Sequence, residues 1–557
     1  MNFIVNESAT KLRGGYYTGA CVARFLARWV LEIGPERLLE PGCGDGAFLE
    51  AVAAVGAGTL RTVVGVELDE AEAAKAAERA VRLRGAATRI VNGDYLEWSL
   101  EQLPAGGQFD AVLGNPPFIR YQYLEDEAQE RAERVFAAHR LPFTRHTNAW
   151  VPFVIAAIGQ LAGGGRLGMV VPAELLHVLH AQALRSHLLA TCSKVLVVDP
   201  QELWFEGALQ GVVLLMAQRK EAGDERSCRL AVLSVRGEEF LHDQPSALEA
   251  RAGYVDAGEL VGKWMSVLLA PGERRAWERV ARAPGVSRFV EVAEVDVGIV
   301  TGANKFFLVP DEVIERHGLE RWAHPMFGRS EHVRGVIYDE ANHRENRRRG
   351  LPTNFVHLGR TSLASLPERV RGYVRAGEAE GLHARYKCRI RTPWYSVPSV
   401  WAAPIGMLKR SHDYPRLVLN EVGALTTDTA YRIKPAPGVD AARLVYSFVN
   451  SVTMLSAELE GRHYGGGVLE LVPSEIEKLV VPMPDLDVEL RRLDARFRAG
   501  DSFDEILRAQ DDVVLRKVGV SAADRDRLHG AWCRLRQRRQ RDPGAAPSPH
   551  GPAGATV

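Results

Sequence analysis

A strand-like apolar run, Phe109–Gly114, is followed by four residues that suit one kind of chemistry: Asn115, Pro116, Pro117 and Phe118. The side-chain carbonyl of Asn115 and the backbone carbonyl of Pro116 can both accept hydrogen bonds from a planar amino group. Proline has a fixed φ and no N–H, so it holds these acceptors in place. Phe118 can stack on the ring that carries the amine. The run predicts a pocket for group transfer to an exocyclic amine, and a proline-rich turn that only ends a buried strand is the alternative.

A glycine-rich turn upstream predicts a site for a nucleotide-like cofactor. Residues 37–49 run from an apolar strand through Gly42, Gly44 and Gly46 into a helix. Glycine lets the backbone approach a ligand closely, and the start of a helix presents free N–H groups. The turn lacks the third glycine of the dinucleotide fingerprint and the lysine of a P-loop, so neither of those sites is indicated.

Two acids end the next two strand-like runs. Glu67 ends 62–67, about 20 residues after the glycines, and Asp94 ends 87–94. Glu67 can accept hydrogen bonds from both ribose hydroxyls of an adenosine-containing cofactor, and Asp94 from an adenine amino group. Either acid could instead only cap a helix. The series of glycines, two acids and then Asn115 indicates a cofactor site beside an amine site.

This order of motifs resembles the DNA amino-methyltransferases that use S-adenosylmethionine (SAM). Within them it resembles the adenine-specific, TaqI-like group, which has a C-terminal target-recognition domain. Gly14–Gly19 is similar to that group's N-terminal cofactor motif, with Gly19 in place of its proline, and Glu40–Gly46 is similar to its first SAM motif. The resemblance implies SAM as cofactor. It also implies a set of cofactor-binding residues: Tyr17, Thr18, Glu40, Pro41, Gly42, Gly44, Gly46, Glu67, Asp94 and Asn115.

The resemblance further implies how the target is held. Adenine is paired inside a duplex, so it must rotate out of the helix before its amino group can react. Asn115, Pro116, Pro117 and Phe118 are then the catalytic set, and Phe205 is the ring expected on the other face of the base. Trp204 is an alternative to Phe205, and core packing of either ring is the competing explanation. Direct methyl transfer needs no metal, and none is expected.

Double-stranded DNA is the expected partner, although the whole chain has 70 Lys and Arg against 70 Asp and Glu. Charge is segregated: residues 381–420 hold seven Lys or Arg and one Asp. Basic residues and rings interleave there, as suits contact with a phosphate backbone. The DNA-binding candidates are Lys387, Arg389, Arg391, Trp394 and Tyr395. A solvated surface and a buried aromatic cluster are the alternatives.

Alternating strand-like and helix-like segments must position these motifs. They predict an α/β fold, a Rossmann-like methyltransferase sheet with helices on both faces, followed by a mixed α+β recognition domain. We expect the catalytic domain at 1–225, a connector at 226–290 and the recognition domain at 291–485. A helical segment at 486–540 and a disordered tail at 541–557 follow.

Other features narrow the class. No apolar run is long enough to span a membrane and the N-terminus lacks a signal-peptide pattern, so a cytoplasmic protein is expected. The six cysteines are scattered, which argues against structural zinc, and none follows a proline as in cytosine ring-carbon methyltransferases.

The sequence therefore predicts a site-specific adenine methyltransferase, the modification enzyme of a restriction-modification or related defence system. A separate cognate restriction endonuclease is a candidate partner. The alternatives are a methyltransferase for an RNA base or a protein glutamine amide, and a non-catalytic DNA-binding subunit of a defence complex.

Overall fold

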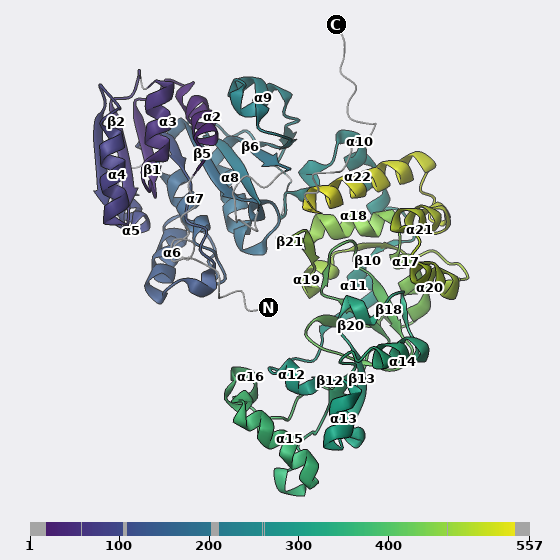
Figure 1. Ribbon diagram of the computed structural model, residues 1–557. Helices are drawn as coiled ribbons and strands as arrows, with labels where there is room; N and C mark the ends of the chain where they lie inside the picture. The colour runs from purple at the N-terminus through teal and green to yellow at the C-terminus, as the bar shows by residue number, and fades with distance from the viewer. Residues whose placement is uncertain are drawn as a thin grey trace. The chain divides into compact units, whose positions relative to one another are not determined.

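The computed structural model divides the chain into two compact units, with the boundary between Leu268 and Leu269. Figure 1 shows the helices and strands of each unit. The structure describes residues 18–56, 58–103, 108–201, 211–258, 260, 262–464 and 466–540. Purple to teal-blue ribbon marks the first unit, and teal to yellow ribbon the second. Among the described residues we find no helix with the length and hydropathy needed to span a bilayer.

In the described part of the first unit, the central feature is a nine-stranded sheet in the order β3-β2-β1-β4-β5-β7-β6-β8-β9. Its strands are β1 (Arg37–Pro41), β2 (Thr62–Glu67), β3 (Ala87–Asn92), β4 (Phe109–Gly114), β5 (Leu161–Pro172), β6 (Cys192–Pro200), β7 (Val212–Arg219), β8 (Arg229–Val235) and β9 (Val255–Asp256). Strands β1 to β5 pair in parallel, and β7 runs antiparallel to β5 and β6. The predicted Rossmann-like α/β class, with its antiparallel strand near the end, is confirmed.

Amphipathic and apolar helices cover this sheet because its central strands are almost wholly apolar and must be buried on both faces. The helices are α2 (Ala20–Leu31), α3 (Ala47–Val55), α4 (Glu70–Ala80), α5 (Tyr95–Gln102), α6 (Asp126–Ala138), α7 (Trp150–Gln160), α8 (Gln182–Thr191) and α9 (Pro245–Arg251). Phe25 and Trp29 of α2 share a hydrophobic core with Leu113 of β4 and Leu196 of β6. This core fixes the strand ends that carry the predicted motifs.

The second unit is mixed α+β. One of its sheets has the order β11-β20-β16-β18-β14 and another the order β12-β15-β13-β19. The strands of the first are β11 (Ala293–Val297), β14 (Ile337–Tyr338), β16 (Ile405–Leu408), β18 (Leu417–Asn420) and β20 (Ala430–Pro435). Those of the second are β12 (Leu308–Val309), β13 (Ala323–Phe327), β15 (Asn354–Val356) and β19 (Leu425–Thr426). Its helices include α10 (Pro271–Ala281), α14 (Glu340–Arg348), α15 (Glu368–Ala379), α16 (Tyr386–Arg389), α18 (Ser451–Glu460), α20 (Leu490–Ala499), α21 (Phe503–Gln510) and α22 (Ala522–Gln540).

The connector expected at 226–290 is corrected by the structure. Its first part supplies β8 and β9, and β8 pairs in parallel with β6 through apolar, buried positions such as Val195 opposite Leu230. Its later part, from Leu269, belongs to the second unit and includes α10. The charged, irregular composition of this stretch comes from loops between these elements, and the apolar residues of β8 decide its place.

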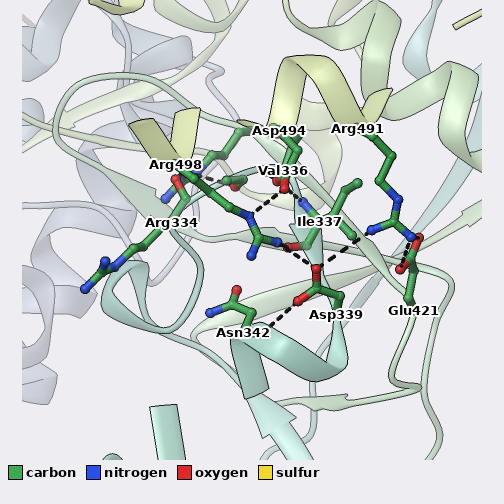
Figure 2. Close-up of polar contacts among 11 residues, drawn as sticks. Arg334, Val336, Ile337, Asp339, Asn342, Glu421, Arg491, Asp494 and Arg498 are labelled. Carbon is green, nitrogen blue, oxygen red and sulfur yellow. Dashed lines mark hydrogen bonds and ion pairs between the residues drawn. The ribbon is translucent and has the colours of Figure 1, made fainter. Parts of the chain in front are cut away.

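The segment at 486–540 is likewise part of the second unit. Figure 2 shows the polar contacts that two of its residues, Asp494 and Arg498, make with the segment 336–339. Asp494 of α20 is buried, and its Oδ1 accepts hydrogen bonds from the backbone N–H groups of Val336 and Ile337, at 2.8 and 2.9 Å. Arg498, one turn later, donates to Asp494 at 2.5 Å and to Asp339 at 3.1 Å. The helix is therefore fixed to the start of β14 by buried polar contacts.

Candidate active site

The strand register brings the predicted motifs to one edge of the first unit's sheet. Glu40 of β1 lies opposite Gly65 of β2, and Glu67 at the end of β2 lies opposite Asn92 at the end of β3. At Gly114, the last residue of β4, a Cβ atom would lie 3.2 Å from the carbonyl oxygen of Pro41. The end of β4, and Asn115 after it, thus lies directly beside the glycine-rich turn.

The glycine-rich turn has the backbone that its composition predicts. Gly42, Gly44 and Gly46 have φ of +62°, +52° and +84°, a region that favours glycine. Gly46 precedes α3, and a Cβ there would lie 3.0 Å from Cα of Ala76 in α4. The turn therefore needs glycine for its conformation, and at Gly46 also for the close approach of two helices.

Glu67 connects this turn to the next loop. Its Oε2 accepts a hydrogen bond from the backbone N–H of Gly44 at 2.8 Å, and its Oε1 accepts from Asp69 at 2.9 Å. Each carboxylate oxygen has a further lone pair, so the same side chain can also accept from a hydroxyl group. Glu67 has a structural role in addition to its predicted cofactor role.

The side chain of Glu40 lies in the interior of the first unit. Its side chain is 2% exposed. Burial raises the pKa of Glu40 well above its usual range, against the backbone N–H groups of Phe48 and Leu49 in α3, which lower it. The carboxyl group of Glu40 thus faces the backbone N–H groups in the first turn of α3. Burial gives Glu40 a role in supporting the turn, and its contact with the cofactor stays a prediction.

Asp94 caps a helix, which was the alternative to a cofactor role for this acid. Its Oδ1 accepts a hydrogen bond at 3.1 Å from the backbone N–H of Glu97, which lies in the first turn of α5. Its Oδ2 lies 3.2 Å from Nε of Arg131 in α6. An adenine amino group would have to share this carboxylate with Arg131.

Asn115 is joined to the N-terminal cofactor motif. Its Nδ2 donates to Oγ1 of Thr18 at 3.2 Å, and Thr18 is buried. Pro116 is buried, Pro117 is half-buried, and the half-buried Phe118 packs against the hydrophobic core of the first unit. Tyr17 and Phe205 lie outside the described residues, so their roles stay predictions.

Asn148 is a residue at this site that sequence reasoning missed. Its Oδ1 accepts from the backbone N–H of Tyr121 at 3.1 Å, and its Nδ2 donates to Glu174 at 3.1 Å. Next to it, the N–H of Ala149 donates to the carbonyl of Ile119 at 3.0 Å. These contacts fix the chain just after Phe118. A single asparagine before an apolar helix carries no pattern that would have identified it.

Two of the predicted DNA contacts are corrected by burial. Trp394 and Tyr395 are 9% and 2% exposed, in a hydrophobic core with Phe306 and Tyr373. Their polar atoms bond within the chain, Trp394 to Glu378 and Tyr395 to the carbonyl of Thr361. Their aromatic character is explained by packing, which was the stated alternative.

Arg391 is also engaged within the second unit. It donates to the carbonyl oxygens of Val300 and Thr301, each at 2.7 Å. Its guanidinium therefore holds one loop to another, and this contact accounts for it without a DNA partner.

Helix α16 is an exposed part of the basic stretch. Lys387 and Arg389 are exposed there, and both lie over the ring of Tyr386, at 5.4 and 5.5 Å from its centroid. Tyr386 is 62% exposed and Ile390 is 63% exposed. A surface that combines cations with an uncovered ring has the composition of a nucleic-acid contact. Tyr386, which the sequence did not single out, replaces Trp394 and Tyr395 as the aromatic candidate.

Comparison with known proteins assigns each unit. Residues 3–244 match the family described as N-6 DNA Methylase. Residues 261–515 match the family described as Type II methyltransferase M.Eco57I, C-terminal domain. Together the two matches cover most of both units.

Full-length relatives agree with these matches. The Type II methyltransferase M.AccI of Acinetobacter calcoaceticus is 20% identical over 83% of this chain and 84% of its own length. M.XamI of Xanthomonas campestris pv. amaranthicola is 24% identical over 84% of this chain and 85% of its own length. Among solved structures, the type IIG restriction endonuclease BpuSI is 14% identical, with a TM-score of 0.45 over 96% of this chain and 67% of that chain.

Proposed function

The chain is an adenine-specific N6 DNA methyltransferase of a restriction-modification system, and on that premise we propose how its residues perform the reaction. The match of the first unit to DNA methylases favours a DNA base over the RNA base and protein amide considered from the sequence. The two carbonyl acceptors of Asn115 and Pro116 form what we call the amine clamp. The observation that carries the residue assignment is the contact between Asn115 and Thr18, because it joins this clamp to the cofactor motif.

We propose SAM as the methyl donor. The turn at 42–46 presents backbone with positive φ at the start of α3, which suits close approach of a ligand. Glu67 retains accepting lone pairs beside that turn and would hold the ribose hydroxyls. When bound, SAM supplies a methyl group on a positively charged sulfur. The residues of this chain need only hold donor and acceptor in line.

We assign the clamp at the end of β4 to the flipped adenine. The amine's lone pair is delocalised into the ring, so it is a poor nucleophile until its N–H groups are drawn out of the plane. The side-chain oxygen of Asn115 and the carbonyl of Pro116 would accept those two N–H groups and stabilise the charge that forms on nitrogen. Phe118 would stack on the base, as would Phe205, and each contact would contribute roughly 1–3 kcal/mol toward the cost of flipping.

The DNA backbone is assigned to α16 of the second unit. Lys387 and Arg389 would neutralise phosphates, and Tyr386 would lie against the sugar or a base. A restriction endonuclease that cuts the same DNA sequence when it is unmethylated is the partner we propose. The methyltransferase acts on genomic DNA, so we place it in the cytoplasm.

Substitution of Asn115 tests the clamp. We expect Asn115→Ala to lower the methylation rate of duplex DNA by at least about 100-fold, because one preorganised acceptor is lost in the transition state. SAM should still bind, as calorimetry would show. Gln244→Ala, which removes an exposed amide from the same unit, is the matched control and should keep full activity. Full turnover by Asn115→Ala would refute the assignment.

A further inference from the structure

A second polar cluster lies in the second unit, and the methyl-transfer site does not use it. It consists of Asp504, His529 and Cys533. His529 and Cys533 are four residues apart on α22 and so lie on one face of that helix, while Asp504 is in the first turn of α21. Oδ1 of Asp504 lies 2.7 Å from Nε2 of His529. Sγ of Cys533 lies 3.5 Å from that nitrogen and 3.8 Å from that oxygen.

We propose that this cluster binds Zn²⁺ or a similar borderline-soft divalent cation. A tetrahedral zinc site, with Zn–S of about 2.3 Å and Zn–N of about 2.0 Å, separates sulfur from nitrogen by about 3.5 Å. The separation between Cys533 and His529 already has this value. The same geometry needs about 3.3 Å between nitrogen and oxygen, so the Asp504 carboxylate would withdraw by roughly half an ångström. Its side chain is 45% exposed and has room to do so.

The ring of His529 is held ready for this role by the groups behind it. His529 is 2% exposed, and its Nδ1 lies 2.9 Å from Oγ of Ser451, at the start of α18. Ser451 is bound through both its Oγ and its backbone N–H to the carboxyl group of Asp511, which is itself buried. Histidines that bind metals almost always donate their second N–H to a carboxylate, a backbone carbonyl or water, which fixes the ring and leaves the other nitrogen to the ion. Here the Ser451 hydroxyl, itself bonded to the Asp511 carboxyl group, would take that place.

The neighbouring charges define how the cation would be held. Arg508 binds the other carboxylate oxygen of Asp504, with Nε 3.1 Å from Oδ2, and Oδ1 is the oxygen that faces His529 and the cation. Three protein ligands and one open position are the pattern of zinc sites that keep a bound water. The exposed side chain of Asp504 gives solvent access to that position. Such a cation would join α21 to α22 and, through His529 and Ser451, to α18.

Binding of Co²⁺ to the full-length protein tests the site, since this ion replaces zinc and reports thiolate ligands by charge-transfer absorption. After removal of metals with a chelator, we expect one equivalent of Co²⁺ to produce a thiolate band in the near ultraviolet and to raise the melting temperature. Cys533→Ser should lose the band and His529→Gln should lose binding. Cys21→Ser, which removes a cysteine of the first unit, should keep both. No band in the wild type, or a band that persists in Cys533→Ser, would overturn the proposal.

A second measurement uses only the wild-type protein, so it does not depend on how the variants fold. Alkylation of Cys533, followed by mass spectrometry, should slow at least several-fold when Zn²⁺ is added, while alkylation of Cys21 should keep its rate. Equal rates at Cys533 with and without Zn²⁺ would count against the site. Neither measurement depends on methyl transfer.

Discussion

Asn115 and Thr18 are separated by 97 positions in the sequence, yet their side chains are hydrogen-bonded. The bond fixes the amide so that its nitrogen faces the cofactor motif. An amide held in this way keeps its oxygen on the opposite side, where an amine would be received. At the scale of single residues, orientation as well as composition of the clamp is therefore set by the fold.

Exposed cations on α16 give a prediction about DNA affinity. Lys387→Ala and Arg389→Ala should each weaken binding of a duplex about equally for all sequences, and each should reduce the slope of log K against log salt by about 1, because one phosphate contact releases about one counterion. Fluorescence anisotropy across a salt series measures both. Lys434→Ala removes an exposed lysine elsewhere in the second unit and should leave the slope unchanged.

Asp511 gives a prediction about pH. Burial raises the pKa of Asp511 from 3.8 to about 7, so the folded protein holds this proton more tightly than the unfolded chain does. The contribution of this bound proton to the free energy of unfolding is fully present below about pH 4. It is lost as the pH rises toward 7, at up to about 1.4 kcal/mol per pH unit. Urea unfolding with a chelator present should show wild type losing roughly 1–3 kcal/mol more than Asp511→Asn between pH 5 and pH 7.5. Equal losses would contradict the assignment.

Sequence reasoning at this scale worked where a residue's neighbours along the chain decide its role. The glycines at 42–46, Glu67 and Asn115 follow strands directly, and the structure has them at one edge of the sheet. Trp394 and Tyr395 could not be placed, because a ring beside basic residues looks the same whether it is buried or exposed. The cluster of Asp504 with His529 was also hidden, since its members are 25 positions apart and the cysteines form no familiar metal motif.

At the scale of elements, α20 shows how a charged helix is fixed to a sheet. Replacing Asp494 by Ala would leave the N–H groups of Val336 and Ile337 without their buried acceptor, and would leave Arg498 with one carboxylate instead of two. We expect the free energy of unfolding of the second unit to fall by about 2–4 kcal/mol.

Chemical denaturation followed by a spectroscopic probe of the second unit measures this loss. Asp501→Ala is the control, because Asp501 forms a more exposed pair with Arg496 near the end of the same helix. That change should cost less than about 1 kcal/mol. A loss at Asp494 no larger than at Asp501 would contradict the role of the buried contacts.

Strands were predictable from sequence where they are apolar and followed by a turn, as in β1, β2 and β4. β8 was missed, because its apolar residues lie within a charged stretch and find their partner in β6, more than 30 positions away, by tertiary pairing. The attachment of α20 was missed for the same reason: its contacts reach back 157 and 158 positions to Ile337 and Val336.

At the scale of the whole molecule, the two units have separate hydrophobic cores, and a ligand of one should stabilise that one alone. We expect calorimetry to show two unfolding transitions. SAM at 100 times its dissociation constant should stabilise one of them by about 2.7 kcal/mol, because it binds only the folded first unit. Asp494→Ala should lower the other. One transition that responds to both changes would contradict the division at Leu268.

Glu67 and Asp94 also bear on how activity is judged in relatives from their sequences. One holds two loops through backbone N–H groups and the other begins α5, so both carboxylates serve folding even where no methyl group is transferred. A pseudoenzyme of this family would therefore retain them, and their presence alone would be no sign of activity. Asn115 is the position at which we expect the first substitutions in a relative that has lost activity.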